Sequence, residues 1–381
     1  MAVKKKTSAG AVPVPVLTPR ALGRATLDRQ LLLRRTAMSA KDAVGHLVGL
    51  QAQNTKPPYY QLLARLEGFR PADLSVLMES REVVRIVTLR STIHTHTADD
   101  ALTLRPLVQA ARDRELGIFR KRLTGVDLDR LRELSRAYVE EAPRTPKEIR
   151  TRLLTEWPEA DPQALSTAAR CLLPLVQVTP RGLWGTSGGV ALTTVEHWLG
   201  RTADAAPDIE DAVLRYLGAF GPASVKDMQS WAGLTRLKEV FERLRPRLVT
   251  FRDEHGTELF DLPDAPRPAE DTPAPPRFLP EFDNVLLGHA DRTRVIPADL
   301  KGLNGVGNQT YGSVLVDGFF AAVWRLDTPP RAPAVVTVQE VRPLTPAERD
   351  AVTEEAAYVI TAMTQAAEYD VRFGSFVDLG R

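Results

Sequence analysis

The stretch Val83–Thr97 reads VVRIVTLRSTIHTHT and holds two β-branched runs on either side of Arg90-Ser91. β-Branched residues favour strands, and a short polar break between two such runs predicts a tight turn. Helical spacing of apolar residues and N-cap signals precede this stretch over residues 17–53, 59–66 and 71–80. Helices followed by a two-stranded wing form a winged helix-turn-helix unit, so the order predicts one such unit near the start of the chain.

The same order recurs twice further along the chain. In the second copy, helices at about 147–156 and 162–173 precede strands at 175–179 and 183–185, joined by a turn at 180–182. In the third copy, helices at 209–220 and 234–244, with a cap at Ser224 between them, precede a hairpin of strands 248–251 and 259–262. Three copies of one supersecondary unit predict an α+β fold with three tandem winged helix-turn-helix units.

The end of the chain is predicted to form a β-rich domain. Strands are expected at 284–288, 293–296, 311–316, 319–326 and 334–341, before a last helix from Pro346 to about Thr364. Residues 297–309 predict a long hairpin tip of the kind that reaches a ligand. The predicted division of the chain is: 1–16, a disordered basic tail; 17–142, winged helix 1 with linking helices; 143–205, winged helix 2; 206–263, winged helix 3; 264–276, a proline-rich linker; 277–381, the C-terminal β-rich domain with its terminal helix.

Length and composition limit the class of protein. A chain of 381 residues divides into several units, and its hydrophobic fraction of 43% is that of a globular protein. Its apolar runs fall short of the ~18 residues that span a membrane, and no apolar core follows Lys4–Lys6, so no signal peptide is expected. A single cysteine, Cys171, fits a reducing compartment, and we expect a cytoplasmic protein. The net charge of +2 neither requires nor excludes nucleic acid.

Two histidines in the first wing raise the question of a metal site. His94 and His96 are two residues apart on a predicted strand, so their side chains point to the same face. A metal site needs further ligands, and the other histidines are scattered without ligand spacing. A polar strand face that meets phosphate is therefore the favoured interpretation, with no metal and no cofactor. The sequence also lacks a nucleophile elbow and a phosphate loop, because no lysine follows the glycine-rich stretch Gly185–Gly189 in the required place.

A pair of glutamines remains as a candidate for chemistry. The stretch Gly49–Pro58 reads GLQAQNTKPP, and its two glutamines, Gln51 and Gln53, stand where the preceding helix is expected to end. If the chain bends after Leu50, both amides can face one space and act on a ligand. The other interpretation is that both amides hydrogen-bond the neighbouring backbone at a helix terminus. The pattern by itself leaves both interpretations open.

Several of these stretches together resemble a known family. They are Gly49–Gln53, Pro58–Tyr60, Leu89–His94, and LPEFDNVLLGHADR at Leu279–Arg292. The chain after residue 16 is similar to winged-helix DNA glycosylases of the AlkZ/YcaQ-like, azinomycin-resistance type. The resemblance implies tandem winged helices and a barrel-like β domain around a C-shaped DNA-binding channel. It also implies that Gln51 and Gln53 are catalytic, because the family's catalytic element is a glutamine, a spacer, and then a glutamine or aspartate.

The resemblance implies a substrate as well. Alkylation at N7 or N3 makes a purine a cationic leaving group, so a pair of amides that positions water is enough for hydrolysis. We therefore expect a monomeric, monofunctional glycosylase that acts on alkylated purines in double-stranded DNA, including bulky genotoxin adducts or crosslinks, and that has no membrane partner. The alternatives are a non-enzymatic winged-helix regulator and a self-resistance protein that sequesters a toxin. The expected DNA contacts are Asn54, Lys56, Arg85, Arg90, His94, His96, Arg292, Arg294, Lys301, Asn304 and Asn308.

Overall fold

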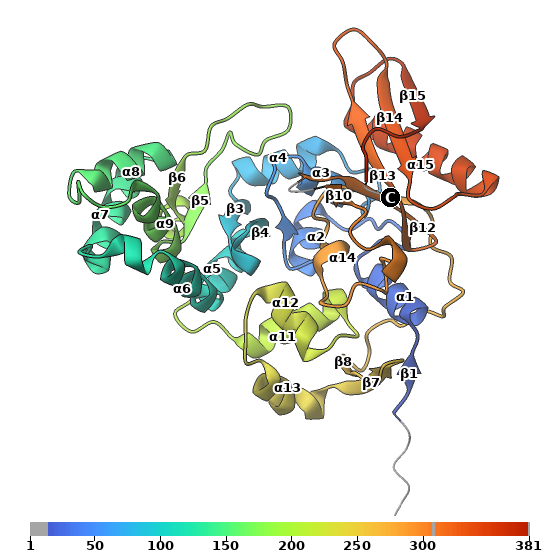
Figure 1. Cartoon of the computed structure of the whole chain (residues 1–381), viewed down its shortest axis with the longest axis horizontal. Helices are drawn as coiled ribbons and strands as arrows, with labels where there is room; N and C mark the ends of the chain where they lie inside the picture. The colour runs from blue at the N-terminus through green and yellow to red at the C-terminus, as the bar shows by residue number, and fades with distance from the viewer. Residues whose placement is uncertain (1–13, 307–308, 380–381) are drawn as a thin grey trace, which may run out of the picture.

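A computed structural model describes residues 14–306 and 309–379 as a mixed structure of helices and sheets (Figure 1). Residues 1–13 of the expected basic tail lie outside the described residues, and Val16 near its end pairs in parallel with Arg252. The first elements are β1 (Val16–Leu17), α1 (Pro19–Arg29), α2 (Ala40–His46), β2 (Leu50–Gln51), α3 (Pro57–Leu63), α4 (Pro71–Glu79), β3 (Val83–Val87), the short 3-10 helix η1 (Leu89–Ser91) and β4 (Ile93–Thr97). The two strands and the turn that the sequence predicts over Val83–Thr97 are confirmed.

Among the described residues, three segments repeat one order: a helix, a single bridging residue or short strand, two helices, and two strands. In each segment the bridging part pairs with the last strand, as β2 does with β4, Arg144 with Leu192, and Ala223 with Phe260. The second segment holds α7 (Leu128–Glu141), α8 (Pro146–Leu154), α9 (Pro162–Leu172), β5 (Leu175–Gln177) and β6 (Leu192–Thr194). The third holds α11 (Ile209–Phe220), α12 (Val225–Ala232), α13 (Lys238–Leu244), η3 (Arg245–Arg247), β7 (Val249–Asp253) and β8 (Glu258–Asp261).

The last strand of the second segment differs from the prediction. The sequence predicts it at 183–185, whereas it lies at Leu192–Thr194, and the glycine-rich stretch Gly185–Gly189 belongs to the long loop before it. The position is fixed by a distant partner, because Arg144 and Leu192 exchange backbone hydrogen bonds of 3.0 and 2.8 Å. α5 (Ala98–Leu107), α6 (Gln109–Ile118) and η2 (Arg120–Leu123) link the first two segments, and α10 (Val195–Leu199) follows β6.

The strands of the first two segments form one sheet. Its order is β2-β4-β3-β5-β6, and β3 joins β5 through the pairs Arg85–Gln177 and Ile86–Val176. This continuous backbone ladder fixes the first two segments relative to each other. It also leaves β2 at the edge of the sheet, so one side of β2 has no strand neighbour among the described residues.

The C-terminal part is built on a second five-stranded sheet with the order β15-β14-β13-β12-β9. Its elements are β9 (Arg277–Leu279), α14 (Asn284–Leu287), η4 (Ala298–Leu300), the hairpin β10 (Gly305–Val306) and β11 (Gln309–Thr310), β12 (Gly312–Val316), β13 (Phe319–Asp327), β14 (Ala334–Glu340), α15 (Pro346–Met363) and β15 (Tyr369–Phe373). The hairpin lies in the expected tip, whose Asn308 is outside the described residues. In Figure 1 this sheet and the second segment lie at opposite ends of the molecule.

Two strands expected in the C-terminal part are wrong. Residues 284–288 begin as helix α14, which Asp283 caps by accepting the Val285 N–H at 3.0 Å, and residues 293–296 form turns. A short buried apolar run fits a helix or a strand equally well by pattern, so only its neighbours decide. Strands β9 and β15 were not predicted. Each is held by pairing with a strand distant in sequence: β9 pairs with β12, and β15 pairs in parallel with β14.

The core joins distant parts of the chain. Leu62 and Leu63 of the first segment pack in one cluster with Phe278, Trp324 and other residues of the C-terminal sheet. The fully buried ion pair Arg65–Asp283, with a shortest N–O distance of 2.7 Å, spans the same junction. A second buried pair, Arg29–Asp261 at 2.6 Å, joins α1 to β8 of the third segment. The start of the chain is therefore fixed against its end.

None of the helices among the described residues is long and apolar enough to cross a membrane.

Candidate active site

Gln51 lies on an edge strand and not at the end of a helix. The preceding helix α2 ends at His46, and Val48 and Gly49 then adopt positive φ angles of 54° and 91° that turn the chain. Leu50 and Gln51 pair with Thr95 and His94 of β4, and the Ala52 N–H donates to the Ile93 carbonyl at 2.7 Å. The expectation of a helix terminus at this point is wrong. A helix that continued to Leu50 would forgo these cross-strand hydrogen bonds.

Gly49 is required at this turn. Its φ of 91° is strained for any other residue, and an added Cβ would lie 2.3 Å from the Cε1 and Nδ1 atoms of the His96 imidazole. The Gly49 carbonyl accepts a hydrogen bond of 2.7 Å from the Nδ2 of Asn284 in α14. The wing histidine and the C-terminal part therefore both fix the chain two residues before Gln51.

The two glutamine amides lie in different surroundings. Gln51 is only 5% exposed, and its Oε1 accepts a hydrogen bond of 2.6 Å from Nη2 of Arg90. Its Nε2 meets no acceptor among the described residues and is not sealed from solvent. Gln53 is exposed, and its Oε1 accepts a longer bond of 3.3 Å from the Ile93 N–H. One amide is therefore held by the protein, and the other lies at the surface.

Arg90 occupies the turn between the two wing strands. Arg90 and Ser91 both have left-handed backbone angles, with φ of 52° and 58°, which residues other than glycine adopt rarely. The Arg90 guanidinium donates to the Trp231 carbonyl in the last turn of α12 as well as to Gln51. Burial, together with the charge of Arg292, lowers the pKa of Arg90 to about 10, so this side chain stays cationic near neutral pH.

His94 and His96 are buried behind the glutamines, with ring centroids 5.5 Å apart. Nδ1 of His94 lies 3.0 Å from the Thr92 carbonyl, which can only accept, so this nitrogen carries the hydrogen. Burial, with the charge of Arg90, holds the pKa of His94 well below its ordinary value, and burial lowers that of His96 to about 4. Both rings are neutral near pH 7. Among the described residues, no group of three or more metal-ligating side chains is found.

Two arginines among the expected DNA contacts face inward. Arg85 is 1% exposed and donates to the carbonyls of Ala52 and Asn54 at 2.9 and 3.4 Å. Arg294 is buried and donates to the Pro222 carbonyl at 2.8 Å. Arg85 thus holds the backbone beside Gln53, and Arg294 joins the C-terminal part to the third segment.

His94 and His96 of the expected set are buried as well, and the remaining contacts outside the wing are more accessible. Lys56, Arg292 and Lys301 are exposed, and Asn304 is partly buried. Asn54 is also exposed, but its Nδ2 donates to Oε1 of Glu281 at 2.9 Å. These side chains belong to the loop after β2, the turns after α14, and the segment that leads into the β10–β11 hairpin.

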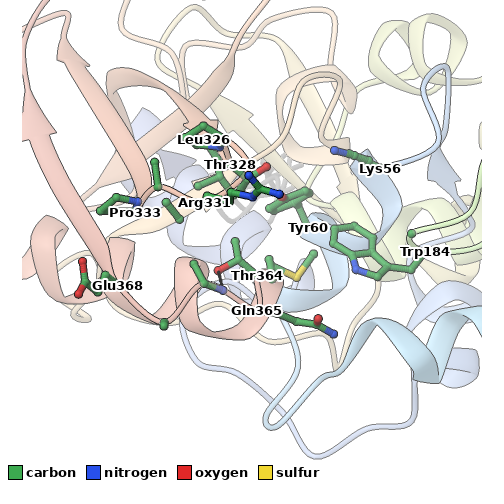
Figure 2. A pocket seen from close by; sticks show the side chains of 17 residues that line it. Lys56, Tyr60, Trp184, Leu326, Thr328, Arg331, Pro333, Thr364, Gln365 and Glu368 are labelled. Atoms are coloured by element: carbon green, nitrogen blue, oxygen red, sulfur yellow. Dashed lines mark hydrogen bonds between the residues drawn. The ribbon is translucent and has the colours of Figure 1, made fainter.

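A cleft of about 900 Å³ begins three residues beyond Gln53, at Lys56. Figure 2 shows Lys56, Tyr60 and Trp184 along one side of this cleft, with Pro333 and Glu368 across from them. Arg331 of the β13–β14 loop also lines it, whereas neither catalytic candidate does. Trp184 and Arg331 were not among the expected site residues. The sequence signal that points to this cleft is Trp184 directly before the glycine-rich stretch Gly185–Gly189.

Comparisons with known proteins show the family and the fold of this chain. A family model described as "DNA glycosylase AlkZ-like" matches residues 44–360, which is most of the chain. Among solved structures, the Streptomyces sahachiroi DNA glycosylase AlkZ is similar, with a TM-score of 0.78, 22% sequence identity, and coverage of 94% of this chain and 100% of that one. At this identity the likeness shows the fold alone. No curated protein matches the sequence.

Proposed function

Because this chain belongs to the AlkZ-like family of DNA glycosylases, we propose that it hydrolyses the N-glycosidic bond of cationic N7- or N3-alkylated purines in double-stranded DNA. Bulky genotoxin adducts and crosslinks are included in this substrate class. The observation that carries the proposal is the amide pair of Gln51 and Gln53: Gln51 lies on the edge strand β2 and is held by Arg90, and Gln53 lies at the surface just after that strand. Amides cannot protonate a leaving group, so the pair suits only a base that leaves readily.

The reaction then needs little from the protein beyond positioning. Water oxygen attacks C1′ of the damaged nucleotide, the C1′–N9 bond breaks, and its electron pair neutralises the alkylpurine cation, which departs as a neutral base. The proton of the attacking water passes to solvent. Gln51 and Gln53 position that water, and an amide oxygen of the pair that faces the sugar stabilises its oxocarbenium-like charge through the negative end of the dipole. Among the described residues, no lysine hydrogen-bonds either glutamine, so a monofunctional enzyme without a Schiff base is proposed.

The scaffold is proposed to hold DNA in a C-shaped channel. The three repeated segments act as tandem winged helices with the boundaries 17–142, 143–205 and 206–263, except that α7 goes with the second unit, and the C-terminal sheet within 277–381 forms the barrel-like part. Asn54, Lys56, Arg292, Lys301, Asn304 and Asn308 are the proposed DNA contacts, because the described members of this set lie at or near the surface. Arg85 and Arg294 act indirectly, through the backbone that they hold. The protein is proposed to act as a monomer.

The test is release of free base from defined DNA under single-turnover conditions. One duplex carries N7-methylguanine, and a second carries a bulky N7 adduct. The double variant Gln51→Ala/Gln53→Ala is expected to lose about 100-fold or more in rate, as removal of grouped positioning contacts does. Gln163→Ala, which removes an exposed glutamine of α9, is the matched control and keeps the wild-type rate. Base release by the double variant at the wild-type rate would exclude the amide pair from catalysis.

A further inference from the structure

We infer that Arg90 is a positioning residue that fixes the Gln51 amide, so that Gln51 acts as a hydrogen-bond donor toward the substrate and Gln53 as the acceptor. This inference rests on the proposed function of the glutamine pair. It assigns different tasks to two glutamines. Arg90, which orients Gln51, is in turn held by the carbonyl of Trp231 in the third segment of the chain.

The orientation of the Gln51 amide follows from the chemistry of its partner. A guanidinium has five N–H donors and no acceptor, so the amide atom 2.6 Å from Nη2 of Arg90 must be Oε1. The opposite orientation would place two donors against each other. Nε2 therefore points away from Arg90, toward the side where it meets no acceptor among the described residues. An oxygen of water, sugar or phosphate is the partner that this N–H₂ group can take.

Besides Gln51, two further acceptors hold the Arg90 guanidinium. Its Nη1 donates to the carbonyl of Trp231, in the last turn of α12, where helix carbonyls lack partners and the helix dipole favours a cation. Its Nη2 also lies 3.5 Å from Nε2 of His94, and the neutral ring presents this nitrogen as an acceptor. Gly233, which ends α12 with a φ of 72°, allows the close approach, since a Cβ there would lie 3.0 Å from the Arg90 Cα.

The two amides are left with complementary tasks. The Oε1 of Gln51 already has a charged donor at 2.6 Å, which draws electron density from the amide and strengthens its N–H groups as donors. The Oε1 of Gln53 receives only a 3.3 Å bond from the Ile93 N–H and is exposed, so it remains the better acceptor for a water proton. The attacking water, which can both accept and donate, would thus lie between a donor and an acceptor.

A double-mutant cycle on the full chain separates this role from a structural one. Arg90→Met keeps the length of the side chain and removes its donors. We expect Arg90→Met and Gln51→Ala each to slow single-turnover release of N7-methylguanine by about 10- to 100-fold. The combined variant should be within about twofold of Gln51→Ala, because Arg90 acts through Gln51. If the two effects multiply in the combined variant, the positioning role is overturned.

Arg292→Met is the matched control for the loss of a cation. Arg292 lies near enough to Arg90 to lower its pKa, yet it is exposed. Its loss should weaken DNA binding. At subsaturating enzyme, the rate of the combined Arg292→Met/Gln51→Ala variant should therefore fall by the product of the two single effects. Arg90→Met should instead leave the Kd for DNA within about threefold of wild type while the saturating rate falls. A lowered affinity with an unchanged saturating rate would make Arg90 a phosphate contact.

A second variant keeps the inference testable if Arg90→Met does not fold. Gln51→Glu places a carboxylate opposite the Arg90 guanidinium, so it keeps the ion-dipole contact but has no N–H to offer. We expect Gln51→Glu to fold and to be about as slow as Gln51→Ala. Full activity of Gln51→Glu would overturn the donor role of Gln51. If the Gln51→Ala/Gln53→Ala variant is also fully active, the amide pair has no catalytic role and the inference fails with it; if only Arg90→Met is fully active, the positioning role alone fails.

Discussion

Asn284 donates a hydrogen bond of 2.7 Å from Nδ2 to the carbonyl of Gly49, which lies 235 positions earlier in the chain. Asn284 begins helix α14 in the C-terminal part, and Gly49 is the turn that leads into the strand carrying Gln51. The same Nδ2 lies 3.4 Å from the Leu47 carbonyl. One buried amide thus meets two carbonyls of the turn that follows helix α2, so the C-terminal part directly shapes the start of the strand that carries Gln51.

Asn284→Leu should therefore impair both stability and activity. Leucine keeps the volume but leaves the buried Gly49 carbonyl without its donor, which costs about 1–3 kcal/mol of unfolding free energy. Base release should also slow, because the turn before Gln51 loses its anchor. Urea unfolding and single-turnover assays measure the two effects. Asn54→Ala, which removes an exposed amide, is the control and should change the unfolding free energy by less than about 0.5 kcal/mol. Unchanged urea unfolding of Asn284→Leu would contradict the anchoring role.

The buried ion pair of Arg65 and Asp283 should contribute most to the stability of the contact between the first segment and the C-terminal part. Both side chains are fully buried, and their shortest N–O distance is 2.7 Å. Arg65→Met leaves the Asp283 carboxylate buried without its cation, so we expect a loss of about 3–5 kcal/mol. Arg70→Met, which breaks an exposed pair with Asp73 at 3.5 Å, should cost no more than about 1 kcal/mol. Urea unfolding measures both variants. An equal loss of unfolding free energy in Arg65→Met and Arg70→Met would show that Arg65 is not needed to stabilise the buried Asp283 carboxylate.

Acid should destabilise the protein through its buried histidines. The pKa of His96 is lowered to about 4 by burial, whereas in the unfolded chain it returns to the ordinary value near 6.5. Between pH 6.5 and pH 4 the unfolded state binds a proton that the folded state does not. Stability therefore falls as the pH falls through this window, with a slope that approaches about 1.4 kcal/mol per pH unit for this residue.

Urea unfolding between pH 7 and pH 4.5 measures that slope. His96→Gln should reduce it by about 1.4 kcal/mol per pH unit near pH 5, where the difference in bound protons is largest. His255→Gln, in the exposed turn between β7 and β8, is the matched control for the loss of a histidine. A slope that is the same in wild type and His96→Gln would mean that the imidazole is not neutral in the folded protein.

DNA affinity should depend on salt through the exposed cations near the site. Each phosphate contact that is lost reduces the slope of log Kobs against log salt concentration by about 1 on duplex DNA. We expect this change for Lys56→Gln, Arg292→Gln and Lys301→Gln, measured singly by titration between 50 and 200 mM salt. Arg372→Gln, which removes an exposed cation of β15 that is paired with Asp370, is the control and should keep the wild-type slope. Wild-type slopes for the first three variants would place the DNA elsewhere.

Local pattern in the sequence is enough for several features. The wing strands β3 and β4 follow from β-branched runs around a short turn, and the helix starts at Thr145 and Ser224 follow from capping boxes that the structure contains. These features depend on neighbours within a few residues, so reading the chain in order finds them. The repeated order of helices and strands, and the candidate pair Gln51 and Gln53, come from the same kind of reading.

Only the tertiary structure decided where the glutamine pair lies and what holds it. Leu47–Gln51 has a pattern that fits either a helix end or a strand, and the partner β4 decides for the strand. The contacts of Arg90 with Trp231 and Gln51, and of Asn284 with Gly49, join parts of the chain that no local pattern connects. Arg85 and Arg294 were expected at the DNA but face inward for the same reason. The sequence alone determined which residues are present and how they repeat, whereas the long-range pairing of buried polar groups determined which of them are held inside the fold and which lie at its surface.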